Sequence, residues 1–346
     1  MYQRTITQKD AGQRFDRYLH KLLPEAGSGF LYKMLRKKNI VLNQKKANGS
    51  EKLICGDVVS VYFAEDTLQK FMGDKPALKE SVFPPVSILY ENEHILLADK
   101  PAGLLTQKAK PEDISLNDWL IDYLLSKRQT TPEELRTFRP SACNRLDRNT
   151  SGIVLCAKSV HGAQVLSEAL KSRSLHKFYL LYAKGRLTGE KTIEGCLVKD
   201  KKKNRVQIVS QGNATGDASY IRTRYLPVLE EADKTLLEVE LITGKPHQIR
   251  AHLASISHPL LGDYKYGDRE WNDDYRRQFQ VTFQLLHAYK VVFPPLGEAF
   301  EDLSGRTFYA PVPEIFHRVS DRKDLVPDCP DAGQRRQGAQ AQRKVW

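Results

Sequence analysis

Residues 144–155 read NRLDRNTSGIVL and join a charged loop to an apolar strand. Asp147 stands between Arg145 and Arg148, and a polar Asn-Thr-Ser-Gly turn separates it from the apolar run. Turn residues of this kind predict that Asp147 lies in an exposed loop directly ahead of buried structure, where catalytic groups often lie. Flanking cations keep a carboxylate ionised, so that it can act as a nucleophile or base. A surface loop with structural salt bridges is the alternative interpretation of these residues.

A second segment, residues 243–253, reads TGKPHQIRAHL and follows an alternating run, Leu237–Leu241. The alternation predicts a half-buried strand, and Pro246 suits the first turn of the helix that comes next. On the first turns of this helix, Arg250 would be a fixed partner for a carboxylate or a phosphate. A purely structural pair between Arg250 and an acid is the alternative.

The same segment argues against a metal site and a nucleotide loop. His247 and His252 are five residues apart, which is about 140° around a helix, so they do not share a face. No acid stands where a zinc-protease helix needs one. The pair Gly244-Lys245 lacks the upstream glycine and the following Ser or Thr of a P-loop. We therefore expect neither a metal nor a nucleotide cofactor.

The composition bounds the class of protein. The chain has 346 residues, which at roughly 100–200 residues per domain suggests two domains. It carries 54 Lys+Arg against 42 Asp+Glu, and a net charge of +12 favours a polyanionic partner. No apolar run is long enough to span a bilayer, and the first residues lack the apolar core of a secretory signal. Five cysteines without a CxxC pair indicate reduced thiols, so we expect a cytoplasmic protein without a zinc module or disulfide framework.

The first 65 residues hold 12 basic and 6 acidic residues, half of the net excess of the chain. Apolar residues recur at helical spacing between Phe15 and Leu23, and Pro24 and Gly27 end that helix. Ser28 is a plausible N-cap for a second helix, which would bury Leu31, Met34 and Leu35. Strands are expected at 40–43 and 58–63. The basic side chains of the second helix then face solvent, either as an RNA contact or simply as a solvated basic face: Lys33, Arg36, Lys37 and Lys38.

Strands and helices alternate without a regular rhythm after residue 85. Strands are expected at 86–90 and 95–98, and helices at 115–127 and 160–172, which favours a mixed α+β fold over a doubly wound sheet. Charged residues with Gly and a Pro-Pro pair mark residues 66–85 as a linker. The polar end of the chain, 321–346, is expected to be a disordered tail. This gives a small α/β domain at 1–65 and a larger domain at 86–320.

The small domain resembles the S4 RNA-binding domain over nearly its whole length. The matching elements are RFDRYL at 14–19, KMLR at 33–36, IVLN at 40–43 and GDV at 56–58. The resemblance implies that this surface contacts RNA through Arg14, Arg17, Lys33, Arg36, Lys37 and Lys38.

The two segments quoted first resemble the RluA-type pseudouridine synthases. The signature loop of that family matches 145–147 and 150–152, and its later Thr-Gly-Arg-x-His-Gln-Ile-Arg element matches 243–253. Further matches follow in order over about 95–290, at DKPAG 99–103, KFY 177–179 and LHA 286–288. The resemblance implies a largely antiparallel catalytic sheet whose central cleft carries the aspartate.

The family reaction breaks the N-glycosidic bond of a uridine, rotates the base and rejoins it through C5, without cofactor, metal or ATP. By resemblance, Asp147 is the nucleophile and Arg250 holds it ionised. Arg145 would fill the space left when the uridine flips out of the RNA. Tyr179 would stack on the uracil or help to deprotonate it. Two further residues are expected to contact RNA: Lys177 and His247.

Two departures from the family pattern occur. Asn144 stands where His is usual, and both side chains can hydrogen-bond the backbone. Lys245 replaces the usual Arg and keeps the charge while losing the bidentate fork. Neither change removes a chemical group that the family mechanism needs.

We therefore expect a synthase that forms pseudouridine in structured RNA. An S4 domain ahead of the catalytic domain suits the branch that acts on large-subunit (23S) ribosomal RNA or pre-ribosomal particles. A synthase acting on transfer RNA, and a non-catalytic RNA-binding or ribosome-assembly protein, are the alternatives. A nucleotide-processing hydrolase or methyltransferase would need a metal cluster or a glycine-rich cofactor loop, which the sequence lacks.

Overall fold

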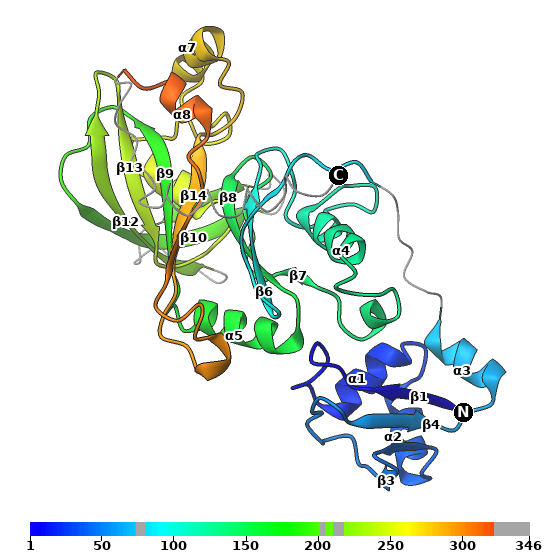
Figure 1. Ribbon diagram of the computed structural model, residues 1–346. Coiled ribbons are helices and arrows are strands. Elements are labelled where there is room, and N and C mark those ends of the chain that lie inside the picture. Colours follow the sequence, from blue (N-terminus) through cyan, green and yellow to red (C-terminus); the bar gives the residue numbers. More distant parts are fainter. Residues whose placement is uncertain (74–80, 201–204, 210–217, 322–346) are drawn as a thin grey trace, which may run out of the picture. The chain divides into compact units, whose positions relative to one another are not determined.

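The computed structural model describes residues 1–73, 81–200, 205–209 and 218–321 (Figure 1). The chain divides into two compact units. The first comprises 1–100, 104–146 and 154–171, and the second comprises 101–103, 147–153 and the chain from Ser172 onward. Each unit contains both helices and strands, as the expected mixed α+β class requires.

The N-terminal part of the first unit is a four-stranded antiparallel sheet with helices packed on it. The strand order is β1-β4-β2-β3, with β1 at Tyr2–Thr5, β4 at Val58–Val61, β2 at Ile40–Leu42 and β3 at Lys45–Lys46. The helices between the first two strands in sequence are α1 (Phe15–Leu22) and α2 (Ser28–Arg36).

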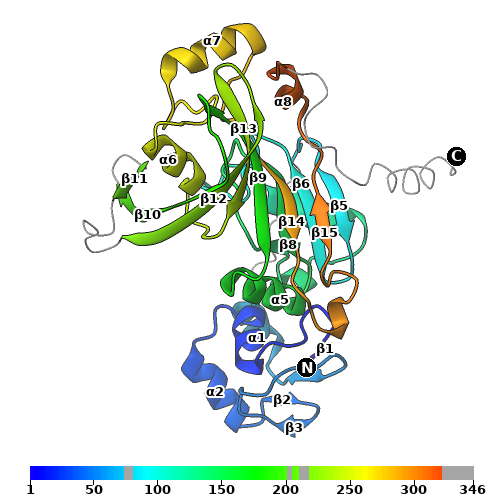
Figure 2. The ribbon, with the colours of Figure 1, turned by 90° about the vertical axis from the view of Figure 1, so that its left-hand side faces the viewer.

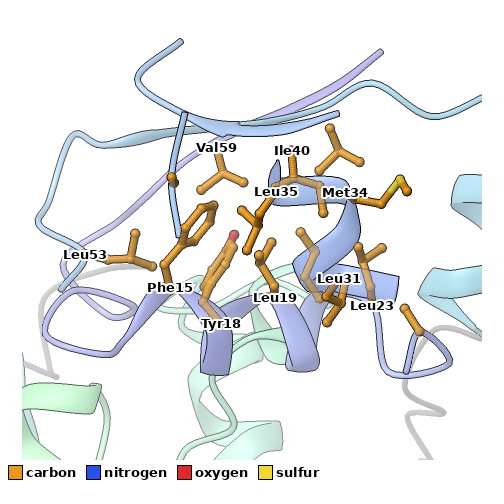
Figure 3. Packing of buried hydrophobic residues seen from close by; sticks show 14 of the residues in the cluster. Phe15, Tyr18, Leu19, Leu23, Leu31, Met34, Leu35, Ile40, Leu53 and Val59 are labelled. Atoms are coloured by element: carbon orange, nitrogen blue, oxygen red, sulfur yellow. The ribbon is translucent and has the colours of Figure 1, made fainter. Parts of the chain in front are cut away.

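Both helices bury the apolar faces that the sequence predicts (Figure 3). Phe15, Tyr18 and Leu19 of α1 are fully buried, and Leu31, Met34 and Leu35 of α2 pack against them. The N-cap of α2 is Gly27, not Ser28, which is already the first helical residue. The side chain of Ser28 therefore does not cap the helix; its hydroxyl lies 3.3 Å from the ring nitrogen of His20.

The linker expected from residue 66 begins with a helix, α3 (Glu65–Met72). Leu68 is 5% exposed and belongs to the same core, and the Phe71 ring lies 4.6 Å from that of Phe30. Two acids in the first turn suit the positive end of the helix dipole. The sequence pattern hid this helix because charged residues surround its few apolar positions. The rest of the expected linker includes 74–80, which lie outside the described residues.

The remainder of the first unit holds a hairpin and two longer helices. Strands β5 (Ser87–Glu91) and β6 (Ile95–Lys100) are antiparallel, and β7 (Ser141–Ala142) pairs with the end of β8 (Ser151–Ala157). Helix α4 (Leu116–Ser126) starts at a capping box, in which Asp118 accepts hydrogen bonds from the backbone and hydroxyl of Ser115 at 3.0 and 2.6 Å. A 3-10 turn, η1, and helix α5 complete the unit, at Glu134–Arg136 and Val160–Lys171.

The second unit is built on a sheet with the strand order β11-β10-β12-β13-β9-β14 (Figures 1 and 2). Neighbouring strands along this order are antiparallel, whereas the first residues of β8, Ser151 and Gly152, pair with β14 in parallel. Strand β15 pairs with the other end of β14. The strand bounds are Lys191–Asp200 (β10), Arg205–Val209 (β11), Ser219–Glu230 (β12), Lys234–Leu241 (β13), His176–Lys184 (β9), Leu286–Val292 (β14) and Thr307–Tyr309 (β15).

The alternating segment forms β13, but the expectation that it is half-buried is wrong. Since β13 lies between β12 and β9, most of its residues are buried on both faces, and even Glu240 is only 8% exposed. Ion pairs make this burial possible: Glu240 contacts Arg224 at 2.5 Å and His176 at 2.6 Å. Alternation of charged and apolar residues along β13 therefore does not place the charged side chains in water.

Three helices complete the second unit: α6 (Gln248–Ser255), α7 (Arg269–Phe279) and α8 (Glu314–Arg318), with a 3-10 turn, η3, at Glu298–Phe300. Helix α6 packs on β10, β11 and β12 (Figure 2). It begins at Gln248, so Pro246 precedes the helix and does not occupy its first turn.

Helices α7 and α8 pack against β9 and β13, where Tyr182, Leu236, Trp271 and Phe316 share one core. Within the part of the chain that is described, no helix has both the length and the apolarity to cross a bilayer. The expected disordered tail, apart from Asp321, lies outside the described residues.

Candidate active site

Asp147 lies in the loop that leads into β8, as the turn chemistry predicts. Its side chain is 28% exposed, so it is partly buried and not fully in solvent. The loop turns tightly, because the Thr150 amide donates to the Asp147 carbonyl at 3.1 Å. The carbonyl of Arg148 in turn accepts a hydrogen bond from the Gly103 amide at 2.9 Å. The backbone around Asp147 is therefore fixed.

Two side chains of the first unit hold the residues that precede Asp147. The hydroxyl of Thr106 donates to the Leu146 carbonyl at 2.9 Å and accepts from the Leu146 amide at 3.1 Å. Thr106 is only 3% exposed, so this backbone has little access to water. The side chain of Asn144 accepts from the Leu155 amide at 2.8 Å, which is the backbone contact expected of this position.

Arg250 joins Asp147 to a second carboxylate. Its Nη1 donates to Oδ2 of Asp147 at 2.9 Å, while its Nε and Nη2 hold Asp263 at 2.7 and 2.9 Å. The expected pair between Arg250 and Asp147 is thus present. Burial would lower the pKa of the guanidinium, but the hydrogen bonds and charge of Asp263, and those of Asp147, raise it above its usual value. Arg250 is a permanent cation shared by two carboxylates.

Asp263 is the buried anchor of this arrangement, and the sequence analysis assigned it no role. Its side chain is 1% exposed and also accepts hydrogen bonds from the backbone amides of Lys265 and Tyr266 at 2.9 and 3.1 Å. Burial alone would raise the pKa of Asp263, but its hydrogen bonds with Arg250 lower it below the usual range. The sequence feature that could have pointed to Asp263 is its place as an acid directly after an apolar run, in LLGD at 260–263.

His247 caps the N-terminus of α6 in a left-handed backbone conformation, with φ of 54°. This conformation costs a residue other than glycine about 1–3 kcal/mol and is held by its surroundings. Its Nε2 lies 3.9 Å from Oδ2 of Asp147, and its Nδ1 lies 2.9 Å from the hydroxyl of Tyr266. Burial lowers the pKa of His247; Arg250 and Lys265 lower it further, and the opposing charge of Asp147 does not reverse this.

Tyr266 links this cluster to the strand β11, which sequence reasoning did not foresee. Its hydroxyl accepts a hydrogen bond from the Val206 amide at 3.0 Å. The guanidinium carbons of Arg205 and Arg250 each lie 5.3 Å from the centre of its ring. Such contacts between a cation and an aromatic face are favourable, and more so when water is excluded.

Tyr179 lies on β9, opposite Val239 of β13 and Ala288 of β14, and is 5% exposed. Burial raises the pKa of its phenol strongly, and the nearby negative charge of Asp147 adds to the rise. Tyr179 is therefore within electrostatic reach of Asp147 and stays protonated.

Lys177 precedes Tyr179 by two residues and is half-buried, and burial lowers the pKa of its amine. A Cβ atom on Gly244 would lie 3.6 Å from its Nζ, so the amine lies beside the loop that leads to His247.

The other expected residues lie on exposed positions. Arg145 is exposed, two residues before Asp147. The basic residues of the N-terminal part are also exposed, and Arg14 is paired with Asp16 at 2.6 Å. The structure thus brings together Asp147, Arg250, His247 and Tyr179 in the second unit, whereas the following residues lie in the first: Arg14, Arg17, Lys33, Arg36, Lys37, Lys38 and Arg145.

The geometry leaves one oxygen of Asp147 available for chemistry. Arg250 holds Oδ2, while no group in the described parts of the chain donates a hydrogen bond to Oδ1. A partly buried carboxylate that pairs with a guanidinium through one oxygen can use its other oxygen as a nucleophile or as a base. In the same described parts, no three side chains of the His, Cys, Asp or Glu type gather as a metal site would require.

Comparison with known proteins gives a match to one family model, to two relatives and to one solved structure. The family model described as RNA pseudouridylate synthase matches residues 94–255. "Ribosomal large subunit pseudouridine synthase C" of Vibrio cholerae serotype O1 is 31% identical over 296 residues, which cover 83% of this chain and 87% of that protein. The protein of the same name from Escherichia coli (strain K12) is 30% identical over 305 residues, covering 85% and 89% of the two chains. The structure of "Human RNA Pseudouridylate Synthase Domain Containing 4" shares the fold, with a TM-score of 0.52, 21% identity and coverage of 66% of this chain and 89% of that one.

Proposed function

The chain belongs to the RNA pseudouridylate synthase family, and from this premise we propose that it converts specific uridines of large-subunit (23S) ribosomal RNA to pseudouridine. The substrate is proposed from the relatives, which are named as large-subunit ribosomal synthases and match over most of their length. The observation that carries the chemistry is the contact between Arg250 and Oδ2 of Asp147, while no donor among the described residues reaches Oδ1.

Asp147 is the proposed nucleophile. The reaction breaks the bond between C1′ and N1 and forms one between C1′ and C5, while C5 loses a proton and N1 gains one. Because the product is an isomer of the substrate, no co-reactant is required. The carboxylate can act at the ribose, at C6 of the uracil or as a base toward the sugar, and each path needs an ionised Asp147. Arg250 donates a hydrogen bond to Oδ2 of Asp147 and places a positive charge beside it.

Two further residues have proposed roles. Since the phenol of Tyr179 stays protonated, its ring suits stacking against the uracil better than acting as a phenolate base. Arg145, an exposed cation beside the loop, would fill the stack after the target nucleotide is extruded.

The first 65 residues are proposed to be an S4 domain that binds RNA. Four basic residues, on α2 and directly after it, are exposed while the opposite face of α2 is buried, so this surface is available to phosphates: Lys33, Arg36, Lys37 and Lys38. Within this proposal the substrate includes pre-ribosomal particles, and a cytoplasmic location stays a prediction of the sequence.

The test uses ribosomal RNA from a strain that lacks this gene. The purified protein and its Asp147→Asn variant are incubated with this RNA, and pseudouridines are mapped by carbodiimide labelling and primer extension. Asp274→Asn serves as control, because Asp274 is an exposed carboxylate on α7. New discrete stops with the unmodified protein and the control, and none with Asp147→Asn, are expected.

Other outcomes separate the alternatives. Primer-extension stops that appear only with transfer RNA would show that transfer RNA, and not ribosomal RNA, is the substrate. Salt-sensitive RNA binding without any stop would instead support a non-catalytic RNA-binding protein.

A further inference from the structure

The hydroxyl of Tyr266 has two hydrogen-bond partners in the described parts of the chain. The Val206 amide can only donate, so the phenol oxygen accepts that bond, at 3.0 Å. The second partner is Nδ1 of His247, at 2.9 Å. No third partner of the hydroxyl occurs among the described residues.

These two contacts determine where the proton of the imidazole lies. The phenol is protonated at neutral pH, because burial raises its pKa. Nδ1 of His247 is the one acceptor that the described residues offer to the phenol proton, so the phenol donates to Nδ1. Nδ1 is then an acceptor, and in a neutral imidazole the proton must be on Nε2.

The proton on Nε2 faces the reaction site. Nε2 lies 3.9 Å from Oδ2 of Asp147, which is too far for a direct hydrogen bond. Oδ2 is already held by Arg250 at 2.9 Å. The His247 side chain is 18% exposed, and no acceptor lies within hydrogen-bond distance of Nε2 among the described residues, so this N–H is available to a substrate beside Asp147.

We propose that Tyr266 fixes His247 as the Nε2–H tautomer, and that this N–H donates a hydrogen bond to a ribose or phosphate oxygen of the uridine nucleotide placed against Asp147. His247 then contacts the substrate, and Tyr266 is a positioning residue that acts through it. The inference rests on the proposed function for the identity of the substrate, whereas the tautomer does not depend on it.

A neutral imidazole suits this position better than a charged one. An imidazolium would place a second cation beside Oδ2 of Asp147, which Arg250 already holds, and its proton on Nε2 would be drawn to that oxygen and away from the substrate. A neutral N–H donor orients an oxygen of the substrate without competing for the carboxylate. His247 has a left-handed backbone, with φ of 54°, and stands at the start of α6.

The tautomer is measured directly on the full chain. Histidine labelled with nitrogen-15 is incorporated, and the His247 signals are identified by their absence in His247→Gln. An unprotonated resonance for Nδ1 and a protonated one for Nε2 are expected at neutral pH. In Tyr266→Phe, which loses only the hydroxyl, the two tautomers should mix. A protonated Nδ1 in the unmodified protein would overturn the proposal whether or not the enzyme is active.

The donor role is tested with three substitutions at His247. The side-chain amide of Gln places an N–H near the position of Nε2 of His247. The shorter amide of Asn reaches only the position of Nδ1, and Ala has no side-chain N–H. We expect kcat for pseudouridine formation to fall less than about tenfold for His247→Gln, and about 100-fold for His247→Asn and His247→Ala. The KM for RNA should change little, because phosphate contacts dominate affinity. Tyr266→Phe removes one neutral hydrogen bond, so kcat should fall roughly threefold to tenfold.

The comparison of Gln with Asn separates a donor from a structural role. Asn adopts the left-handed conformation more readily than Gln, so His247→Asn should be the more stable variant by urea unfolding. A purely structural His247 would make Asn the better enzyme, and that order would overturn the proposal. If the unmodified protein forms no pseudouridine, the proposed function fails together with the substrate contact, while the nitrogen spectra still decide the tautomer.

Discussion

Arg250 and Asp263 form a buried bidentate ion pair, with Nε to Oδ2 at 2.7 Å and Nη2 to Oδ1 at 2.9 Å. Because the guanidinium is planar, this pair fixes the direction of the remaining nitrogen, Nη1, which donates to Asp147. Asp263, which has no proposed chemical role, therefore orients Arg250. Arg250 in turn holds Asp147, the proposed nucleophile.

Asp263→Asn should weaken both the fold and the site. Removing one charge leaves Arg250 partly uncompensated in a buried position, so the free energy of unfolding should fall by about 3 kcal/mol in urea titrations. The control is Asp274→Asn, whose ion pair with Arg277 is exposed, and its change should stay within about 1 kcal/mol. Equal effects of the two substitutions would show that the buried pair does not anchor the site.

His287 should make the protein sensitive to mild acid. Burial lowers its pKa to about 4, whereas an unfolded histidine titrates near pH 6.5. As pH falls from about 6.5 to 4, the unfolded chain takes up a proton that the folded chain does not, so stability falls, by about 3 kcal/mol in total.

Urea titrations at several pH values measure this slope. His287→Gln should flatten it, while His317→Gln, at an exposed position, should keep it. An unchanged slope in His287→Gln would contradict the prediction.

Gly152→Ala should be poorly tolerated for a steric reason. Gly152 has φ of +105°, and a Cβ atom there would lie 2.2 Å from the carbonyl oxygen of Ala288 on β14. Gly305 also has a positive φ, +68°, but a Cβ atom there would meet open space. We expect Gly305→Ala to cost about 1–2 kcal/mol, and Gly152→Ala to cost more than about 4 kcal/mol or to prevent folding. Thermal unfolding of both variants measures the difference, and similar melting temperatures would argue against the close approach of β8 and β14.

Thr106 should control the position of the loop that carries Asp147. Thr106→Val keeps the shape but leaves the amide and carbonyl of Leu146 without a partner, at a cost of about 1–3 kcal/mol. The rate of pseudouridine formation should fall about tenfold if the free energy of orienting Asp147 for the reaction rises by a comparable amount. Thr106→Ser keeps the hydroxyl and should stay within about threefold. RNA affinity, measured by filter binding, should not change in either variant, and a rate for Val equal to that for Ser would contradict this role.

The basic surface of α2 should set the salt dependence of RNA binding. Replacing Lys33, Arg36 and Lys37 with Gln removes up to three phosphate contacts, so the slope of log affinity against log salt should become less steep by about one per lost contact. Gln at Arg269 and Arg277 of α7 is the control, since both are exposed cations outside the proposed S4 domain. An unchanged slope in the α2 variant would mean that the S4-like surface does not bind RNA.

Much of the local structure followed from the sequence. The apolar spacing of residues 15–35 determined which faces of α1 and α2 are buried, because helical periodicity acts over a few residues. The turn chemistry placed Asp147 in the loop before β8. The resemblance paired Asp147 with Arg250 across 103 residues, and the two side chains do meet.

Only the tertiary structure determined how the site is supported. Asp263 and Tyr266 lie in the loop after α6 and Val206 lies on β11, and the hydrogen bonds of the site depend on how α6, β11 and this loop pack together. The burial of β13 likewise depends on its neighbours, β12 and β9, and not on its own alternation. Periodicity reports which side chains share a face of one element. Which partner lies opposite that face, and which nitrogen of His247 carries the proton, depends on contacts between segments distant in sequence.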